Sequence, residues 1–102
     1  MTSPRETRGL LTVITEAALE DTLLRDFARL GAPGCTVSDA RGRGQRGVRD
    51  AAWGEAANVR IEVICRRERA EALLEHLQQH YFADYAMVAF VQDVVVLRPE
   101  KF

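Results

Sequence analysis

Two periodicities alternate along the chain, and their order restricts the folds that it can adopt. Apolar residues occupy every second position of Asn58–Cys65, the pattern of a strand with one buried face. Gly9–Thr15 is a short apolar run rich in β-branched residues and predicts a buried strand. Two longer segments instead repeat their apolar residues every three or four positions, as amphipathic helices do. The chain therefore predicts a fold in which strands and helices are interleaved.

The first helix is expected to follow the first strand without a loop. Thr15 can cap it, and Glu16 places an acidic residue in its first turn. Gly31 is expected to end it, because glycine readily adopts the left-handed conformation found after a helix. The predicted inner stripe is Leu19, Leu23, Phe27 and Leu30.

The second helix is predicted at Glu68–His80, and two more strands complete the pattern. Cys35–Ala40 alternates as a strand does, and Ala86–Leu97 is a long apolar strand. Gln92 and Asp93 interrupt that strand and predict a bulge or a bend. The order strand-helix-strand-strand-helix-strand is that of the ferredoxin-like α+β fold, in which two helices cover one face of a four-stranded antiparallel sheet. The inner stripe of the second helix comprises Ala70, Leu73, Leu74, Leu77 and Tyr81.

The second face of this sheet needs a cover. The first strand is apolar on both sides, and the last strand is almost continuously hydrophobic. Soluble monomers rarely expose a patch of that size. We therefore expect the second face to pack against other copies of the chain.

The chain has 102 residues, a formal net charge of -1 and 47% hydrophobic residues, which is typical of one globular domain spanning 1–102. Residues 1–8 are polar and are expected to form a flexible N-terminus. Apolar runs of the ~20 residues needed for a membrane span are absent from the sequence. Cys35 and Cys65 lie in strand-like stretches and are expected to be buried thiols in the cytoplasm.

Arginine and glycine are concentrated in one loop, residues 41–56, which shows neither periodicity. Glycines allow backbone N–H groups to surround an anion, and guanidinium groups donate bidentate hydrogen bonds to phosphate or carboxylate oxygens. The loop lacks the Gly-Lys-Ser/Thr ending of a Walker loop. It is either a local anion site on a nearly neutral protein or an ordinary solvated loop. Its arginines up to position 49 are Arg41, Arg43, Arg46 and Arg49.

Other chemistry-bearing residues leave alternatives open. His76 and His80 have the spacing of a metal pair on one helix face, but further ligands are missing nearby, which favours structural or surface histidines over a metal site. Trp53 is either a contact surface for a partner or a side chain packed on its own domain. No Ser-His-Asp or Cys-His arrangement and no loop carboxylate pair is recognisable in the sequence, so we expect no catalytic residues and no enzyme activity.

The sequence resembles the PII signalling superfamily, in particular the PII-like branch associated with bicarbonate transporters and carboxysomes, the carboxysome-associated PII proteins. The resemblance covers VITEAALEDTLLRDFARLGAPGCTVSDARGRGQRGVR, ANVRIEVIC and HYFADYAMVAFV. Its specific motifs are G-x-G-x-x-G-V-R at Gly42–Arg49 and Y-F-x-D-Y-A at Tyr81–Ala86. The resemblance implies a homotrimer of ferredoxin-like subunits, with residues 41–56 as the T-loop and an adenine nucleotide in each cleft between subunits.

Several site residues are implied by this resemblance. Arg46 and Arg49 match T-loop arginines that hold the nucleotide phosphate, and Arg43 matches a basic position at the loop base. Gly44 and Gln45 would offer backbone contacts. The remaining implied contacts are Thr36 and Val37 beside the adenine, Met87 and Val88 closing the cleft, and Arg98 approaching from the last strand.

The resemblance also implies a role. The expected ligands are AMP and ADP, with ATP and cyclic AMP as further candidates, and bicarbonate as a second ligand. The implied partner is a bicarbonate transporter or a carboxysome component, so a cytoplasmic protein could associate with a membrane or a carboxysome through that partner. When phosphate draws the arginines inward the loop would adopt one shape, and its tip with Trp53 would either present or hide the partner surface.

Two departures and one rival function complete the expectations. Between Arg41 and Ala57 there is no tyrosine, serine or threonine, so control by tyrosine nucleotidylation or serine phosphorylation of this loop is not expected. Some relatives carry a cysteine-containing tail, which is not seen after RPEKF, so redox control through such a tail is not expected. The rival is an RNA- or single-stranded-DNA-binding module that uses the Gly/Arg loop and stacks Trp53 on a base. The near-zero net charge argues against it, and no nucleic-acid partner is expected.

Overall fold

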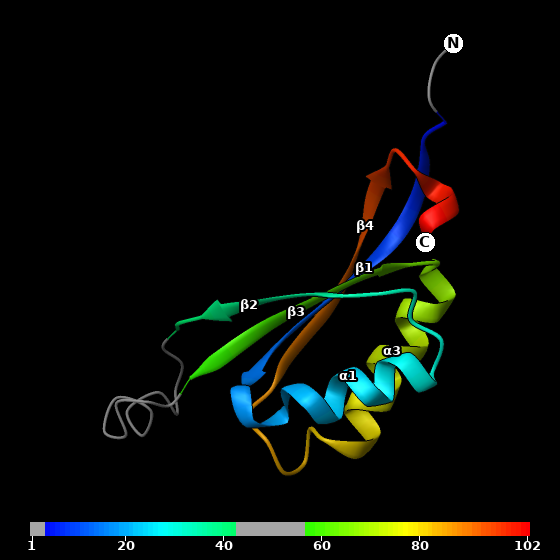
Figure 1. The fold of residues 1–102 in the computed structure, drawn as a ribbon. Helices are drawn as coiled ribbons and strands as arrows, with labels where there is room; N and C mark the ends of the chain where they lie inside the picture. The colour runs from blue at the N-terminus through cyan, green and yellow to red at the C-terminus, as the bar shows by residue number, and fades with distance from the viewer. Residues whose placement is uncertain (1–3, 43–56) are drawn as a thin grey trace.

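The computed structural model describes residues 4–42 and 57–102, and within them four strands form one antiparallel sheet with two α-helices on one side of it (Figure 1). The sheet order is β2-β3-β1-β4. This arrangement confirms the predicted ferredoxin-like α+β fold. The elements in chain order are β1 (Glu6–Glu16), the 3-10 turn η1 (Ala17–Leu19), α1 (Glu20–Arg29), β2 (Thr36–Ala40), β3 (Asn58–Cys65), α3 (Arg67–His80), β4 (Val88–Val96) and the 3-10 turn η2 (Pro99–Lys101).

The core lies between the sheet and the two helices. Alternate residues of β1 and β3 point into it, and the register pairs Leu11 with Val63 and Val13 with Ile61. The helices contribute the inner stripes that the sequence predicted. From α1 and α3 the buried side chains are Leu23, Phe27, Ala70, Leu73 and Leu77, with Leu24, Leu30, Leu74 and Tyr81 packed partly buried around them.

Helix α3 approaches β1 closely at Gly9. A Cβ atom built on Gly9 would lie 3.0 Å from the Cβ of Ala70 and 3.2 Å from the Cα of Arg67. Contacts of 3.0–3.4 Å are tighter than nine in ten real Cβ contacts, so a side chain at position 9 would require α3 to shift by a few tenths of an ångström.

The start of α1 differs from the prediction. Thr15 does not cap a helix but lies in β1, opposite Val59, with its side chain buried. Pairing with β3 keeps the chain extended through Glu16, and the N–H of Ala17 then donates to the carbonyl of Ala57 over 2.9 Å. The predicted capping role of Thr15 is wrong because this inter-strand pairing outweighs the local capping preference.

The end of α1 is as predicted. Gly31 has a φ of 93°, a left-handed conformation that side chains disfavour. The guanidinium of Arg69 in α3 donates from Nη1 to the carbonyl of Leu30 over 2.7 Å, which satisfies one of the free carbonyls at the helix end.

Strand β4 contains no bulge at Gln92 and Asp93. Gln92 pairs with Leu10 and Asp93 with Gly9, in unbroken register with their neighbours. Asp93 is accommodated because its side chain is 63% exposed, and its Oδ1 also forms an ion pair with Nη1 of Arg67 at 2.5 Å. Of the two predicted alternatives, a bulge or a bend, the bulge is therefore wrong.

The two cysteines differ in environment. Cys65 is buried at 1% exposure, as predicted, whereas Cys35 is exposed. The prediction for Cys35 is wrong because β2 begins only at Thr36, and Cys35 belongs to the connection from α1.

The N-terminal part of β1 extends beyond the strand that the sequence predicted. Glu6, Thr7 and Arg8, which were assigned to the flexible N-terminus, pair with Val94–Val96 of β4. Arg8 is buried there. The described part of the N-terminus is therefore tied into the sheet from Glu6 onward.

The sheet face opposite the helices, here called the open face, carries a group of apolar side chains among polar ones. It carries Leu10 and Ile14 from β1, Ile64 from β3, and Val88 and Phe90 from β4. Val88 and Phe90 are 57% and 40% exposed. In a single chain, the apolar side chains of β4 on this face are therefore exposed to solvent, which supports the predicted packing against other copies.

Candidate functional site

A cavity of about 450 Å³ lies at one end of the open face. This volume is within the range of small-molecule sites, about 300–1,000 Å³. β1, β2 and β3 form its floor, and the α1–β2 connection and the C-terminal segment form two walls. The lining residues are Leu10, Pro33, Gly34, Cys35, Thr36, Glu62, Ile64, Lys101 and Phe102.

The floor combines an apolar area with a polar one. Leu10 and Ile64 are register partners on adjacent strands, so their side chains lie next to each other. Thr36 and Glu62 are register partners one row away and add a hydroxyl and a carboxylate. An apolar surface beside a few polar groups suits a flat heteroaromatic ring that also carries hydrogen-bonding atoms.

Glu62 is partly neutralised by a neighbour on its own strand. Arg60 lies two residues earlier on the same face, and its Nη2 is 3.4 Å from Oε2 of Glu62. The Glu62 side chain is nevertheless 35% exposed, so its carboxylate remains available to a ligand N–H group.

Of the residues expected to flank the ligand, β2 carries two. Thr36 lines the cavity. Val37 points to the opposite side of the strand and packs against the core, so only its backbone can face a ligand. β2 pairs with β3 alone among the described strands, and its outer edge therefore offers backbone N–H and C=O groups.

Met87 and Val88 lie far from Thr36 within one chain. Val88 starts β4, the edge strand on the other side of the sheet, and Met87 packs partly buried against the core. Two strands, β3 and β1, separate β4 from β2. Met87 and Val88 can therefore share a ligand with Thr36 only if the β4 edge of one copy meets the β2 edge of another copy. Such head-to-tail contacts form a closed ring of subunits.

The remaining expected site residues are distributed as follows. Arg98 is exposed and precedes η2, next to the cavity wall but outside the lining. The site residues predicted in the T-loop, Arg43, Gly44, Gln45, Arg46, Arg49 and Trp53, lie outside the described residues. The segment that holds them begins after Gly42, and Ala40 lies four residues, about 13 Å, along β2 from Thr36.

Sequence reasoning missed most of the lining. The alternation of β3 had already placed Glu62 and Ile64 on the face away from the core, and this signal could have identified them. Lys101 and Phe102 gave no such signal, because a four-residue C-terminal segment shows no periodicity.

The histidine pair belongs to a separate polar cluster between the helices. Nε2 of His76 is 3.0 Å from Oδ2 of Asp26, and the hydroxyl of Tyr81 donates to the same oxygen. The His76 and His80 rings are 4.5 Å apart. Groups of three or more metal-type ligands do not occur in the part of the chain that the structure describes. The carboxylate partner supports the structural role of His76.

The hydrogen bonds between Asp26, His76 and Tyr81 change the pKa values of Asp26 and Tyr81. Partial burial alone would raise the pKa of Asp26, but the hydrogen bonds from Tyr81 and His76 lower this pKa below its usual value. Burial and the hydrogen bond to Asp26 raise the pKa of Tyr81 to about 12. Tyr81 therefore remains a protonated donor at neutral pH.

The thiols permit a direct test of the cavity wall. Cys35 is exposed in the wall, whereas burial of Cys65 also raises the pKa of its thiol. We expect a thiol reagent such as DTNB to modify one cysteine per native chain rapidly and two in denaturant. Cys35→Ser should abolish the fast reaction, and persistence of that reaction would contradict the described wall.

Comparisons with known proteins support this architecture. The family model described as Nitrogen regulatory protein P-II matches residues 8–101. The chain is 41% identical to a PII-like signaling protein from Thermus thermophilus, with a TM-score of 0.83 and coverage of 100% of this chain and 99% of that one. It is 27% identical to CPII from Thiomonas intermedia bound to ADP and bicarbonate, with a TM-score of 0.85 and 99% of each chain covered.

A second structure of CPII, bound to ADP, AMP and bicarbonate, gives 27% identity and a TM-score of 0.84 over 99% of this chain and 98% of that one.

In the described ranges, no helix combines the length and the apolar character that a membrane span requires. Because the family match extends over nearly the whole sequence and the fold agrees with it, the chain belongs to the Nitrogen regulatory protein P-II family.

Proposed function

We propose that this chain is a regulatory sensor without enzyme activity that binds ADP or AMP, together with bicarbonate, at clefts between the subunits of a homotrimer. PII family proteins are regulatory proteins that form trimers and bind adenine nucleotides. The observation that carries the proposal is the cavity on the open face, whose floor joins Leu10 and Ile64 to Thr36 and Glu62. The ADP and bicarbonate in the CPII structure are the ligands that we transfer to it.

The chemistry of the cavity suits the base of the nucleotide. The two apolar side chains of the floor can contact the ring face, and Glu62 can accept a hydrogen bond from an exocyclic amino group. The phosphates would extend toward the arginine-containing segment, where Arg46 and Arg49 would bind them and Arg43, Gly44 and Gln45 would add contacts. Bicarbonate is a small planar anion that suits a guanidinium group of the same segment.

The neighbouring subunit would complete each site. Met87 and Val88 of one copy would close the cavity of the next, since they cannot reach it within their own chain. Arg98 would approach from beside the C-terminal wall. ATP and cyclic AMP are alternative occupants of the same cleft.

Signalling would proceed through the segment 41–56. Phosphate binding would favour one loop conformation over another, and a ligand can shift this balance only by its difference in affinity for the two. Trp53 would then contact the regulated protein, for which we propose a bicarbonate transporter or a carboxysome component. The carboxysome-associated branch and any localisation at a membrane or carboxysome are parts of this proposal.

Arg46→Ala is expected to weaken ADP and AMP binding at least tenfold, about the loss of one charge-assisted contact to phosphate. Isothermal titration calorimetry of the trimer measures the dissociation constants, and bicarbonate is included in a parallel series. Arg25→Ala, an exposed change on α1, is the matched control and should leave both constants unchanged. Equal ADP affinity in Arg46→Ala and the unmodified chain would reject the role of Arg46.

The same titration separates the proposal from nucleic-acid binding. If the chain binds RNA with an affinity that falls steeply with salt and shows no heat of binding with any adenine nucleotide, the sensor function is rejected.

A further inference from the structure

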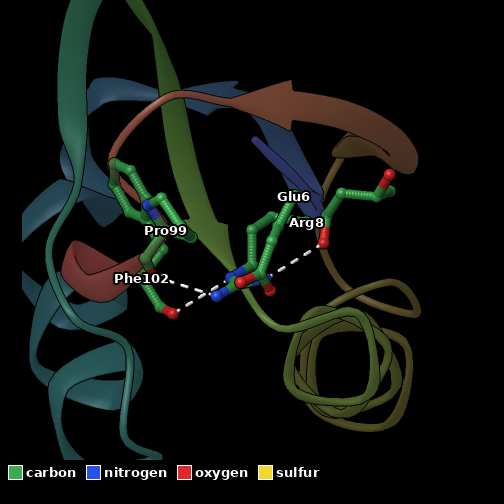
Figure 2. Close-up of polar contacts among 5 residues, drawn as sticks. Glu6, Arg8, Pro99 and Phe102 are labelled. Carbon is green, nitrogen blue, oxygen red and sulfur yellow. Dashed lines mark hydrogen bonds and ion pairs between the residues drawn. The ribbon is translucent and has the colours of Figure 1, made fainter. Parts of the chain in front are cut away.

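Arg8 is a buried arginine whose side chain holds the C-terminal segment in place (Figure 2). Only 5% of its side chain is exposed. Nε donates to the backbone oxygen of Phe102 over 3.2 Å, and Nη2 donates to the carbonyl of Pro99 over 3.0 Å; these two hydrogen bonds are here called the clamp. Nη1 donates to Glu6 Oε1 and to the carbonyl of Thr7. All three nitrogens of the guanidinium are therefore in use.

The segment that Arg8 binds forms one wall of the cavity. Lys101 and Phe102 line the cavity, and Pro99 at the start of the same turn is buried. The segment is a single 3-10 turn. The N–H of Lys101 donates a hydrogen bond to the carbonyl of Arg98, and the N–H of Phe102 donates one to the carbonyl of Pro99. An isolated turn of this length is not stable by itself, so contacts to the sheet must determine its position.

The same strand carries the floor and the clamp. Arg8 and Leu10 are two residues apart on the open face of β1, and Leu10 is part of the cavity floor. β1 and the guanidinium of Arg8 therefore connect the cavity floor directly to the wall formed by Phe102, and they fix the distance between the two. Lysine could not replace this arrangement, because its ammonium lacks the planar fork that contacts two carbonyls at once.

We propose that Arg8 is a positioning residue for the nucleotide cavity: its guanidinium holds residues 99–102 against the sheet and so preorganises the Phe102 wall. This inference rests on the proposed function, because it assumes that the cavity binds the base of ADP or AMP. Without the clamp, residues 99–102 would become ordered only when the nucleotide binds. The conformational entropy lost in that ordering would reduce the binding free energy and so lower the affinity for ADP. No direct contact between Arg8 and the ligand is involved.

The test uses ADP as the probe and the full-length trimer. Arg8→Lys is expected to weaken ADP binding about tenfold by calorimetry. Glu6→Gln is the matched control: it removes the charge partner of Nη1 but keeps the bonds to Phe102 and Pro99, and its ADP affinity should stay within about twofold of the unmodified chain. ADP affinity that is equal in Arg8→Lys and the unmodified chain would overturn the inference.

A double-mutant cycle distinguishes positioning from a general loss of stability. Phe102→Ala alone removes the side chain of the wall and should also weaken ADP binding. If Arg8 acts through Phe102, Arg8→Lys should add little to Phe102→Ala. Full additivity of the two losses would overturn the inference. If Arg8→Lys does not fold, the Phe102→Ala variant is tested alone. ADP affinity of Phe102→Ala equal to that of the unmodified chain would then overturn the inference.

Hydrogen exchange separates failure of this inference from failure of the proposed function. In Arg8→Lys the amides of Lys101 and Phe102 should exchange faster than in the unmodified chain, with or without ligand. If they do and the unmodified chain binds no adenine nucleotide, the clamp exists and the proposed function is wrong. If ADP binds and these exchange rates do not change, the clamp is wrong and the function stands.

Discussion

Phe90→Glu is expected to convert the proposed homotrimer into folded monomers. Phe90 lies on the open face of β4, next to the still more exposed Val88, and the register places it beside Thr12 of the central strand. A carboxylate at this position would have to be buried between subunits without a partner, at a cost of several kcal/mol. Within one chain the side chain is partly exposed, so the fold itself should tolerate the charge.

Size-exclusion chromatography with light scattering measures the mass, and circular dichroism verifies the fold. Val95→Glu is the matched control, because Val95 lies on the same strand but on the opposite side and is 69% exposed. It should remain trimeric. Because Met87 and Val88 are proposed to close the neighbour's cavity, the Phe90→Glu monomer should also lose at least tenfold in ADP affinity. A trimeric Phe90→Glu protein would exclude the open face as the interface.

Thr36→Trp is expected to abolish nucleotide binding, with a loss of at least about a hundredfold in ADP affinity. Thr36 stands at the edge of the cavity, where the larger indole would occupy the space that we assign to the base. The side chain is exposed on an edge strand, and tryptophan is well accepted in strands, so stability should change little.

Calorimetry with ADP measures this loss. Asp39→Trp introduces the same side chain on the other side of β2 and should bind ADP normally. Protection of the Cys35 thiol gives a second readout, since ADP should slow its modification in the unmodified chain and in Asp39→Trp but not in Thr36→Trp. Normal ADP binding by Thr36→Trp would place the nucleotide elsewhere.

Local patterns were sufficient for the elements and for the core. The alternation in Asn58–Cys65 predicted β3 with its bounds, and the apolar stripes of both helices are the ones that pack on the sheet. Gly31 ended α1 as expected because its positive φ is a property of a single residue. Periodicity is reliable here since burial on one side of an element repeats along the chain.

Predictions that depended on one or two residues failed where a distant segment decided the outcome. Thr15 resembles a helix cap, but pairing with β3 keeps it in β1. Asp93 resembles a bulge residue, but Arg67 of α3 neutralises it within a regular strand. In both cases the interaction joins residues that are far apart in sequence, and no local pattern contains it.

The amino-acid order alone determined the strand and helix sequence, the apolar open face and the local concentration of arginine. Only the folded chain could bring Thr36, Glu62, Leu10 and Phe102 around one cavity and place Arg8 under its C-terminal wall. Secondary structure and burial arise from neighbours along the chain, whereas a cavity is a space between elements. Its shape depends on strand register and on long-range hydrogen bonds, which exist only after the elements have packed.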